Sequence, residues 1–257
     1  TRLTFLDNTG SSTFGGADIL LFGAVARISE CRFSNSRGGT SDAQHSGALM
    51  IQRGSTCRVL DSTFEDAYSE GDGGSVVVTL GSNAEFIRTT FRRSEAAGYG
   101  GIAAIRDEST ALFQQCDLRE GVASFAGGIY ITEGSVVNVT RCTLAYCHSQ
   151  YRGYDIPGNA GAIAAYGDAF IQDSVFEHNE ADGYAGDLYA GLGGHIEVVR
   201  TAFGGTRAGS VGGSILVGTS SSGTFTDSTF VDVQLTDAET YGGGLAFINE
   251  NARAELV

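Results

Sequence analysis

Residues 73–91 read Gly-Gly-Ser-Val-Val-Val-Thr-Leu-Gly-Ser-Asn-Ala-Glu-Phe-Ile-Arg-Thr-Thr-Phe. A glycine pair opens this stretch, and a large apolar anchor, Phe91, closes it 17 residues after Gly74. The pattern returns about every 27 residues, which indicates a repeat architecture. The anchors of successive copies, which we expect to form one ladder in the core, are Phe33, Phe64, Phe91, Leu118, Leu144, Phe176, Phe203 and Phe230.

Each copy contains segments with the period of a β-strand. Small or apolar residues alternate with polar ones in Ala84-Glu-Phe-Ile-Arg-Thr-Thr-Phe91, as expected of two strands with one buried face and a bend between them. A third apolar run follows each glycine pair, and a turn such as Gly81-Ser-Asn comes next. The sequence therefore predicts an all-β, right-handed parallel β-helix, a single-stranded solenoid of about nine coils with three short strands per coil.

Other repeat architectures fit less well. No segment has apolar residues at helical spacing over 10 residues or more, and a propeller blade needs about 40 residues per unit. No linker rich in proline or serine interrupts the pattern, so residues 1–257 are predicted to form one domain. Both ends of the sequence break off within a copy of the repeat, and we expect the domain to be a segment of a longer solenoid.

Two motifs within the repeat resemble those of a known family. The first appears as Gly15-Gly-Ala-Asp18, Ser46-Gly-Ala-Leu49, Ala160-Gly-Ala-Ile163 and Gly212-Gly-Ser-Ile215, and the second as Phe176-Glu-His-Asn179. Together they resemble the Gly-Gly-Ala-Ile and Phe-x-x-Asn repeats of the polymorphic outer membrane proteins and related β-helix regions of surface proteins. The resemblance implies the fold and a surface or adhesive role.

The charge balance limits the partners. The chain has 30 acidic residues against 16 basic ones, all of them arginine, for a net charge of -14. Phosphate binding needs a basic stripe, so nucleic acid and anionic membrane surfaces are not expected partners. The longest apolar runs fall short of the roughly 20 residues that cross a bilayer, so no membrane span is predicted in this segment.

Three connections between an anchor and the next glycine pair are longer than the rest. They cover Ser34–Ser46, Ala145–Ala160 and Val231–Gly242, and all leave from the same corner of the coil. Solenoids often build a binding face from insertions on one edge, and tyrosine with arginine is typical of interaction anchors. The predicted binding residues are Tyr146, His148, Tyr151, Arg152, Tyr154 and Asp155. The alternative is a tolerated surface loop, because long loops cost little free energy.

Catalysis is the alternative to a binding role, because β-helices also include polysaccharide lyases and hydrolases. Pairs such as Asp72 with Asp107, or Asp187 with His195, are imaginable acid–base partners, but no recognisable catalytic string repeats. The four histidines, His45, His148, His178 and His195, are scattered over different coils, which does not favour a metal site. The sequence predicts neither an enzyme nor a cofactor.

The cysteines and one tripeptide suggest covalent modifications. Cys31, Cys116 and Cys142 share a small slot two residues before the anchor, where other coils have serine or threonine. Cys116 with Cys142, or Cys142 with Cys147, are the plausible disulfide pairs. Asn138-Val-Thr is a glycosylation sequon on the outward side of a predicted strand.

These observations lead to one functional expectation. The chain is expected to be a non-enzymatic structural or adhesive β-helix, extracellular or on the cell surface, and part of a larger adhesin, sheath or filament protein. Its expected partners are proteins, glycans, or further coils added at the open ends of the solenoid. The alternative is a carbohydrate-active or carbohydrate-binding β-helix that resembles polysaccharide lyases.

Overall fold

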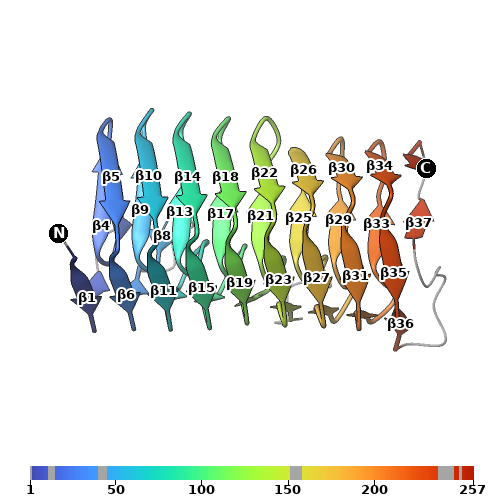
Figure 1. Cartoon of the computed structure of the whole chain (residues 1–257), viewed down its shortest axis with the longest axis horizontal. Coiled ribbons are helices and arrows are strands. Elements are labelled where there is room, and N and C mark those ends of the chain that lie inside the picture. Colours follow the sequence, from blue (N-terminus) through green and yellow to red (C-terminus); the bar gives the residue numbers. More distant parts are fainter. Residues whose placement is uncertain (1, 11–14, 40–44, 151–157, 237–245, 249–250) are drawn as a thin grey trace.

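The strands stack side by side in one elongated body, which runs from blue to red in Figure 1. The computed structural model describes residues 2–10, 15–39, 45–150, 158–236, 246–248 and 251–257. Four parallel sheets of nine strands each, called sheets A, B, D and E, wind along the body, together with a two-stranded sheet C. Every strand inside these sheets pairs with its equivalents one coil before and after, as a parallel β-helix requires, and the end strands pair on one side.

Sheet E contains the longest strands, which alternate between buried and exposed residues. In β14, Ala84 and Phe86 are buried while Asn83 and Glu85 are exposed, so the period-two pattern of the sequence is realised. Rings from successive strands stack inside, with the centroids of Phe86 and Phe113 4.9 Å apart. The strands are β5 (Val25–Ser29), β10 (Thr56–Leu60), β14 (Asn83–Ile87), β18 (Thr110–Gln114), β22 (Val136–Thr140), β26 (Asp168–Gln172), β30 (His195–Val199), β34 (Ser222–Thr226) and β38 (Arg253–Leu256).

Sheet A brings the apolar anchors into register. Phe33, Phe64 and Phe91 are Cα partners on consecutive strands, and their rings stack with centroids 4.4 and 5.0 Å apart. The eight anchors form one inward column, and Phe230 at its end is partly buried. The strands are β1 (Thr4–Leu6), β6 (Arg32–Ser34), β11 (Thr63–Glu65), β15 (Thr90–Arg92), β19 (Asp117–Arg119), β23 (Thr143–Ala145), β27 (Val175–Glu177), β31 (Ala202–Gly204) and β35 (Thr229–Val231).

Sheet B is a fourth strand position, where the sequence predicted only three. Each of its strands has two residues, which is too short to show an apolar period, so the sequence pattern did not reveal it. A residue with positive φ, such as Asp66 at 55°, separates each strand from sheet A. The strands are β2 (Thr9–Gly10), β7 (Arg37–Gly38), β12 (Tyr68–Ser69), β16 (Glu95–Ala96), β20 (Val122–Ala123), β24 (His148–Ser149), β28 (Glu180–Ala181), β32 (Arg207–Ala208) and β36 (Gln234–Leu235).

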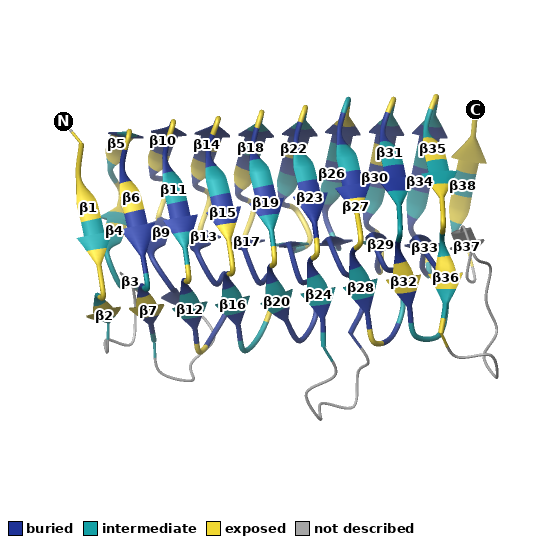
Figure 2. Cartoon of the chain, turned by 60° about the horizontal axis from the view of Figure 1, so that its bottom comes forward, coloured by how far each residue is buried: buried dark blue, intermediate teal, exposed yellow. Residues whose placement is uncertain are grey.

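Sheet D follows the glycine pairs and is buried on both faces through much of its length (Figure 2). A Cβ on Gly74 would lie 2.0 Å from the carbonyl oxygen of Gly101 on the next coil, which explains why the repeat needs glycine there. The strands are β4 (Ile19–Phe22), β9 (Leu49–Gln52), β13 (Val76–Val78), β17 (Ala103–Ile105), β21 (Ile129–Ile131), β25 (Ile163–Ala165), β29 (Leu188–Ala190), β33 (Ile215–Val217) and β37 (Ala246–Ile248), and sheet C pairs β3 (Gly15–Gly16) with β8 (His45–Ser46).

Candidate functional site

The three long connections noted in the sequence all run from a strand of sheet B toward a strand of sheet D. They follow β7, β24 and β36 and lead toward β9, β25 and β37. One corner of the coil therefore carries all three. Four of the six residues proposed for partner binding, Tyr151, Arg152, Tyr154 and Asp155, lie outside the described residues.

The other two proposed binding residues are Tyr146 and His148. Tyr146 lies at the tight corner between β23 and β24, where its φ is 56° and its side chain is about half exposed. Its ring stacks on His178 from the next coil, with centroids 5.1 Å apart. His148 lies on β24, and its Nε2 is 2.8 Å from Oδ1 of Asp182. Tyr146 is thus available at the surface, whereas His148 is engaged with a carboxylate.

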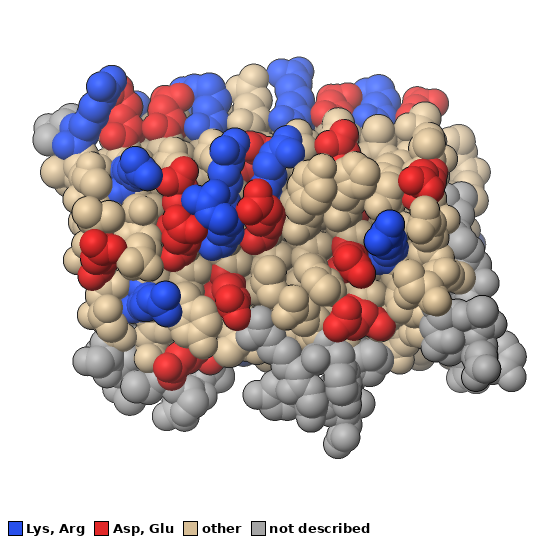
Figure 3. All heavy atoms as spheres, turned by 90° about the horizontal axis from the view of Figure 1, so that it is seen from below, with Lys and Arg blue, Asp and Glu red and all other residues tan. Residues whose placement is uncertain are grey.

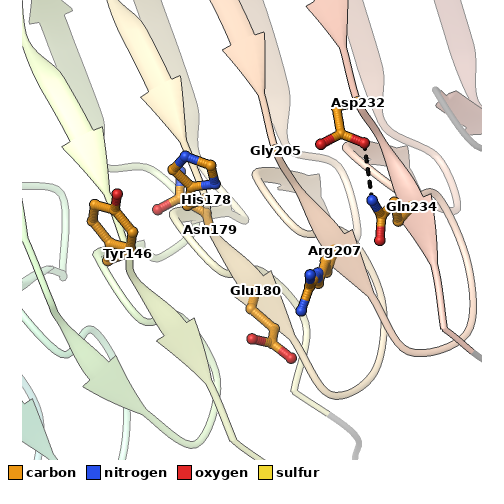
Figure 4. Close-up of a pocket in the computed structure, with 8 residues that line it drawn as sticks. All are labelled: Tyr146, His178, Asn179, Glu180, Gly205, Arg207, Asp232 and Gln234. Atoms are coloured by element: carbon orange, nitrogen blue, oxygen red, sulfur yellow. Dashed lines mark hydrogen bonds between the residues drawn. The ribbon is translucent and has the colours of Figure 1, made fainter.

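Tyr146 forms part of the wall of a pocket, which we call the corner pocket (Figure 4). It has a volume of about 310 Å³ and lies where strands of sheet A turn into strands of sheet B. The lining combines a ring pair, two carboxylates, a guanidinium and amides, and consists of Tyr146, His178, Asn179, Glu180, Gly205, Arg207, Asp232 and Gln234. These groups can hydrogen-bond a small polar ligand and also stack against it.

A row of aromatic side chains covers part of the outer face of sheet D, which we call the tyrosine face. Tyr130 and Tyr189 stand at the centres of β21 and β29, and neighbouring rings come from the connections on either side. Tyr99 stacks on Tyr130 with centroids 4.7 Å apart, and Tyr166 lies 5.9 Å from Tyr189. The full row is Tyr99, Phe125, Tyr130, Tyr166, Tyr189 and Tyr184. Sequence reasoning missed it, because the rings come from several positions of the repeat and none of these positions is aromatic in every coil.

An enclosed ion pair lies close to the tyrosine face. The guanidinium of Arg106 contacts the carboxylate of Asp72, which is 2% exposed and also accepts a hydrogen bond of 3.1 Å from the amide of Tyr99. Burial raises the pKa of Asp72 to about 6, against the opposing effects of Arg106 and the Tyr99 amide. Asp107, its imagined partner, instead accepts a hydrogen bond from Thr79. The acid pair considered from the sequence is therefore not formed.

Asp187 is the most enclosed carboxylate of the described chain whose contacts include no cation. It accepts hydrogen bonds from Asn179 (2.9 Å), Thr206 (2.6 Å) and Ser214 (2.7 Å). Burial raises its pKa to about 6, although these hydrogen bonds oppose the shift. The imagined pair with His195 is not formed, because Nδ1 of His195 contacts Ser222 at 2.8 Å.

The contacts of Asp187 recur at the other end of the body. Asp18 occupies the equivalent place before β4, and its Oδ1 accepts a hydrogen bond of 2.5 Å from Asn8. Asn8 and Asn179 both stand three residues after an aromatic ring of sheet A, so the asparagine of Phe-x-x-Asn holds an aspartate in each case, fully buried at Asp187 and partly buried at Asp18. The two Asn–Asp pairs in the sequence were the signal that could have revealed this polar seam.

Comparison with known families agrees with the geometry. A family model described as "right handed beta helix region" matches residues 74–254, which is more than half of the chain. This protein belongs to the right-handed β-helix family. No curated protein and no solved structure matches the chain. The predicted right-handed parallel β-helix is thereby confirmed, whereas the resemblance to polymorphic outer membrane proteins gains no separate support.

The five cysteines of the β-helix are buried free thiols, so neither expected disulfide is formed. The physical reason is that each slot thiol takes part in backbone hydrogen bonds. The thiol of Cys142 accepts from the amide of Cys116 (3.3 Å) and donates to the carbonyl of Thr140 (3.4 Å). Ser174 and Thr201 make equivalent bonds in later coils, which explains why serine, threonine and cysteine interchange at this position.

Asn138 lies at the centre of β22 with its side chain exposed, between buried Val137 and Val139. The β-helix thus presents the sequon to solvent. Among the described residues, no group of three His, Cys, Asp or Glu side chains is arranged to hold a metal ion. Within the same residues there is no helix long and apolar enough to cross a membrane.

Proposed function

We propose that this β-helix is a non-enzymatic structural or adhesive protein of the cell surface or extracellular space, part of a larger adhesin, sheath or filament protein. The observation that carries the proposal is the continuous stack of coils, which buries one apolar column from end to end. With nine strands per sheet at the spacing of parallel strands, the body is roughly 40 Å long. A rod of this kind is suited to hold other parts of a larger protein apart and to present surface loops to partners.

The state of the buried carboxylates supports a structural role. Asp72 is tied to Arg106, and Asp187 to Asn179 of its own turn and to Thr206 and Ser214 of the next coil. Both groups hold coils together, and both are almost fully withdrawn from solvent. The repeat motifs shared with surface proteins point in the same direction. Further coils could add at β1, β2 and β5, which each pair with only one strand among the described residues.

The direct test is to incubate the purified protein with a panel of acidic and neutral polysaccharides and to measure reducing ends and unsaturated products. We expect no turnover above that of an Asp72→Asn, Asp187→Asn double variant. Adhesion of protein-coated beads to cells should persist in the same double variant if it folds. Product release by the wild-type protein that disappears in the double variant would overturn the proposal.

A second candidate function, carbohydrate binding without cleavage, is favoured by the tyrosine face. Aromatic rings with polar edges suit the stacking of sugar rings, and Tyr99 is the most exposed of them at 38%. A Tyr99→Ala variant should lose retention in a glycan-containing gel. Tyr68→Ala, on sheet B, serves as the control and should leave retention unchanged. Equal retention of both variants would refute this candidate.

A further inference from the structure

The corner between sheets A and B contains a column of residues with positive φ, one from each coil. In the early coils, residues of this column hydrogen-bond to one another across successive coils. Asn35 donates a hydrogen bond of 2.6 Å to Asp7, and Arg93 donates two, of 2.7 and 3.1 Å, to Asp66. The guanidinium of Arg37 also lies over the ring of Tyr68, 5.7 Å from its centroid. The charged side chains in this part of the surface therefore have partners within the molecule.

At the corner pocket, the described residues of this column no longer form hydrogen-bonded pairs with one another. Tyr146 and His178 stack on each other, the next residue in the column is Gly205, and the one after that is Asp232. A Cβ on Gly205 would lie 2.3 Å from Nδ1 of His178, so the imidazole leans over the glycine. Because Gly205 has no side chain, the space between His178 and Asp232 stays open.

The charges of the corner pocket do not cancel. Glu180 and Arg207 are Cα partners on β28 and β32, lie next to each other in Figure 4, and offset one another. Asp232 is exposed and accepts a hydrogen bond of 2.9 Å from Gln234, and no ion pair of Asp232 is formed among the described residues. The pocket therefore offers one net negative charge beside a pair of rings.

The rest of the molecule shows which group fits beside such an aspartate. At three corner positions the aspartate receives two hydrogen bonds from an arginine one coil away: Arg88 on Asp61, Arg93 on Asp66 and Arg200 on Asp173. A guanidinium matches a carboxylate in this two-bond geometry and also stacks on aromatic rings. Acidic and basic side chains alternate along this side of the molecule in Figure 3.

We propose that the corner pocket binds a guanidinium group, the side chain of an arginine on a protein partner. The guanidinium pairs with Asp232 over the open position at Gly205 and packs against the ring of His178, which stacks on Tyr146. Its contact with the carboxylate is of the same kind as that between Arg93 and Asp66, but it comes from the side of the preceding coil. The net charge of -14 favours the approach of a basic segment. The corner pocket shares no residue with the tyrosine face, so this binding is independent of any glycan site.

The experiment is an NMR titration of the protein, labelled on histidine and tyrosine rings, with the peptide acetyl-Gly-Arg-Gly-amide. Matched peptides carry lysine or glutamine in place of arginine. We expect saturable shifts of the His178 and Tyr146 rings, with a dissociation constant on the order of 1 mM for the arginine peptide. The lysine peptide should bind more weakly, because it lacks the two-bond geometry, and the glutamine peptide should cause no shift.

Two variants locate the binding. Asp232→Asn should weaken the arginine peptide about tenfold. Its matched control, Asp227→Asn, removes the same charge from the other corner of the same coil, where φ is 50° rather than 54°, and should leave the affinity unchanged. Gly205→Arg would fill the pocket from within and should abolish the shifts, with circular dichroism to confirm folding; if this variant does not fold, the two asparagine variants decide.

Several results would overturn the proposal. These are equal shifts with all three peptides, an unchanged affinity in Asp232→Asn, or an equal loss in Asp227→Asn. Lysine and arginine peptides of equal affinity would show a general cation site rather than a guanidinium site. Monosaccharides that shift His178 while the arginine peptide does not would assign the pocket to glycans instead.

Discussion

The phenylalanine column inside the coils and the tyrosine face outside sheet D are both rows of aromatic rings, but their geometries differ. Inside, Phe33 and Phe64 stack with planes 3° apart, and Phe203 and Phe230 with planes 4° apart. Outside, most neighbouring rings meet at larger angles, such as the 69° between Tyr166 and Tyr189. Register accounts for the difference: inner rings occupy one repeat position and must lie parallel, whereas outer rings come from strands and connections.

The comparison separates what holds the fold together from what meets a partner. A ring at the repeat position of the inner column is part of a shared core and, away from the ends of the body, is fully buried. A ring that appears in one coil only is tied to its neighbours by local contacts and keeps polar edges near solvent. We therefore expect the two rows to respond differently to substitution, and the largest effect should come from the inner column.

The strongest test of the comparison is Phe91→Ala. Phe91 is fully buried and contacts Phe64, Phe86 and Phe113, so its removal leaves a cavity between coils. We expect a loss of about 3–5 kcal/mol in the free energy of unfolding, measured by urea titration. A loss below about 1 kcal/mol would contradict the view that the inner column carries the stability.

A second test concerns the polar seam next to the inner column. Burial raises the pKa of Asp187 from 3.8 to about 6, so between these values the folded state binds a proton that the unfolded state lacks. The unfolding free energy should therefore fall as pH rises from about 4 to 6, by up to about 3 kcal/mol for this group. Urea titrations at several pH values measure the slope.

The matched variants for this test are Asp187→Asn and Asp173→Asn. Asp187→Asn should reduce the slope between pH 4 and 6 by about half, because Asp72, whose pKa is also raised to about 6, still titrates in this window. Asp173 is partly exposed, and the hydrogen bonds from Arg200 lower its pKa. Its effect on the pH dependence of stability therefore lies below about pH 4. Asp173→Asn should leave the slope in place, and a slope that is unchanged in Asp187→Asn would contradict the role of Asp187.

A smaller effect distinguishes two rings of the tyrosine face. The hydroxyl of Tyr166 accepts a hydrogen bond of 3.1 Å from Asn159, a side chain that is 2% exposed. Tyr166→Phe removes this acceptor and should cost about 1 kcal/mol in thermal or urea unfolding. Tyr130→Phe, in the same row, should cost less. Equal costs would mean that ring packing alone, without hydroxyl bonding, orders the tyrosine face.

The smallest effect is expected at the exposed corners. Arg88 forms two hydrogen bonds with Asp61, but both side chains are about half exposed, and such pairs add little to stability in water. Arg88→Gln should leave the urea midpoint unchanged within error at physiological salt. A clear loss that disappears in high salt would show that the charge columns contribute to stability as well as to solubility.

Several features of the fold could be predicted from single residues. Gly74 and its equivalents were recognisable because a backbone carbonyl of the next coil leaves no room for a side chain, and Phe91 because an anchor must recur at a fixed spacing. The two-residue strands of sheet B could not be predicted, since no period can be seen in two residues. The thiols of Cys116 and Cys142 looked suited to a bridge by spacing, but the backbone uses both.

The candidate site was predicted less completely. Tyr146 was identified as a binding residue from its place near an insertion, and it lies in the wall of the corner pocket. His178, Arg207 and Asp232 were not identified, because they are separated from Tyr146 along the chain and meet it only through the stacking of coils. The pocket itself depends on the absence of a side chain at Gly205. The space that this leaves can be recognised only when the positions of the neighbouring coils are known.

The sequence alone determined the winding of this protein, because spacing and alternation repeat in every coil and the backbone has one way to bury all of the copies. It also determined the inner column, since equivalent residues must superimpose. Only the tertiary structure decided which outward groups meet. Contacts such as Tyr99 with Tyr130, or Arg106 with Asp72, join neighbouring coils and repeat positions that differ, and no period in the sequence encodes such pairs.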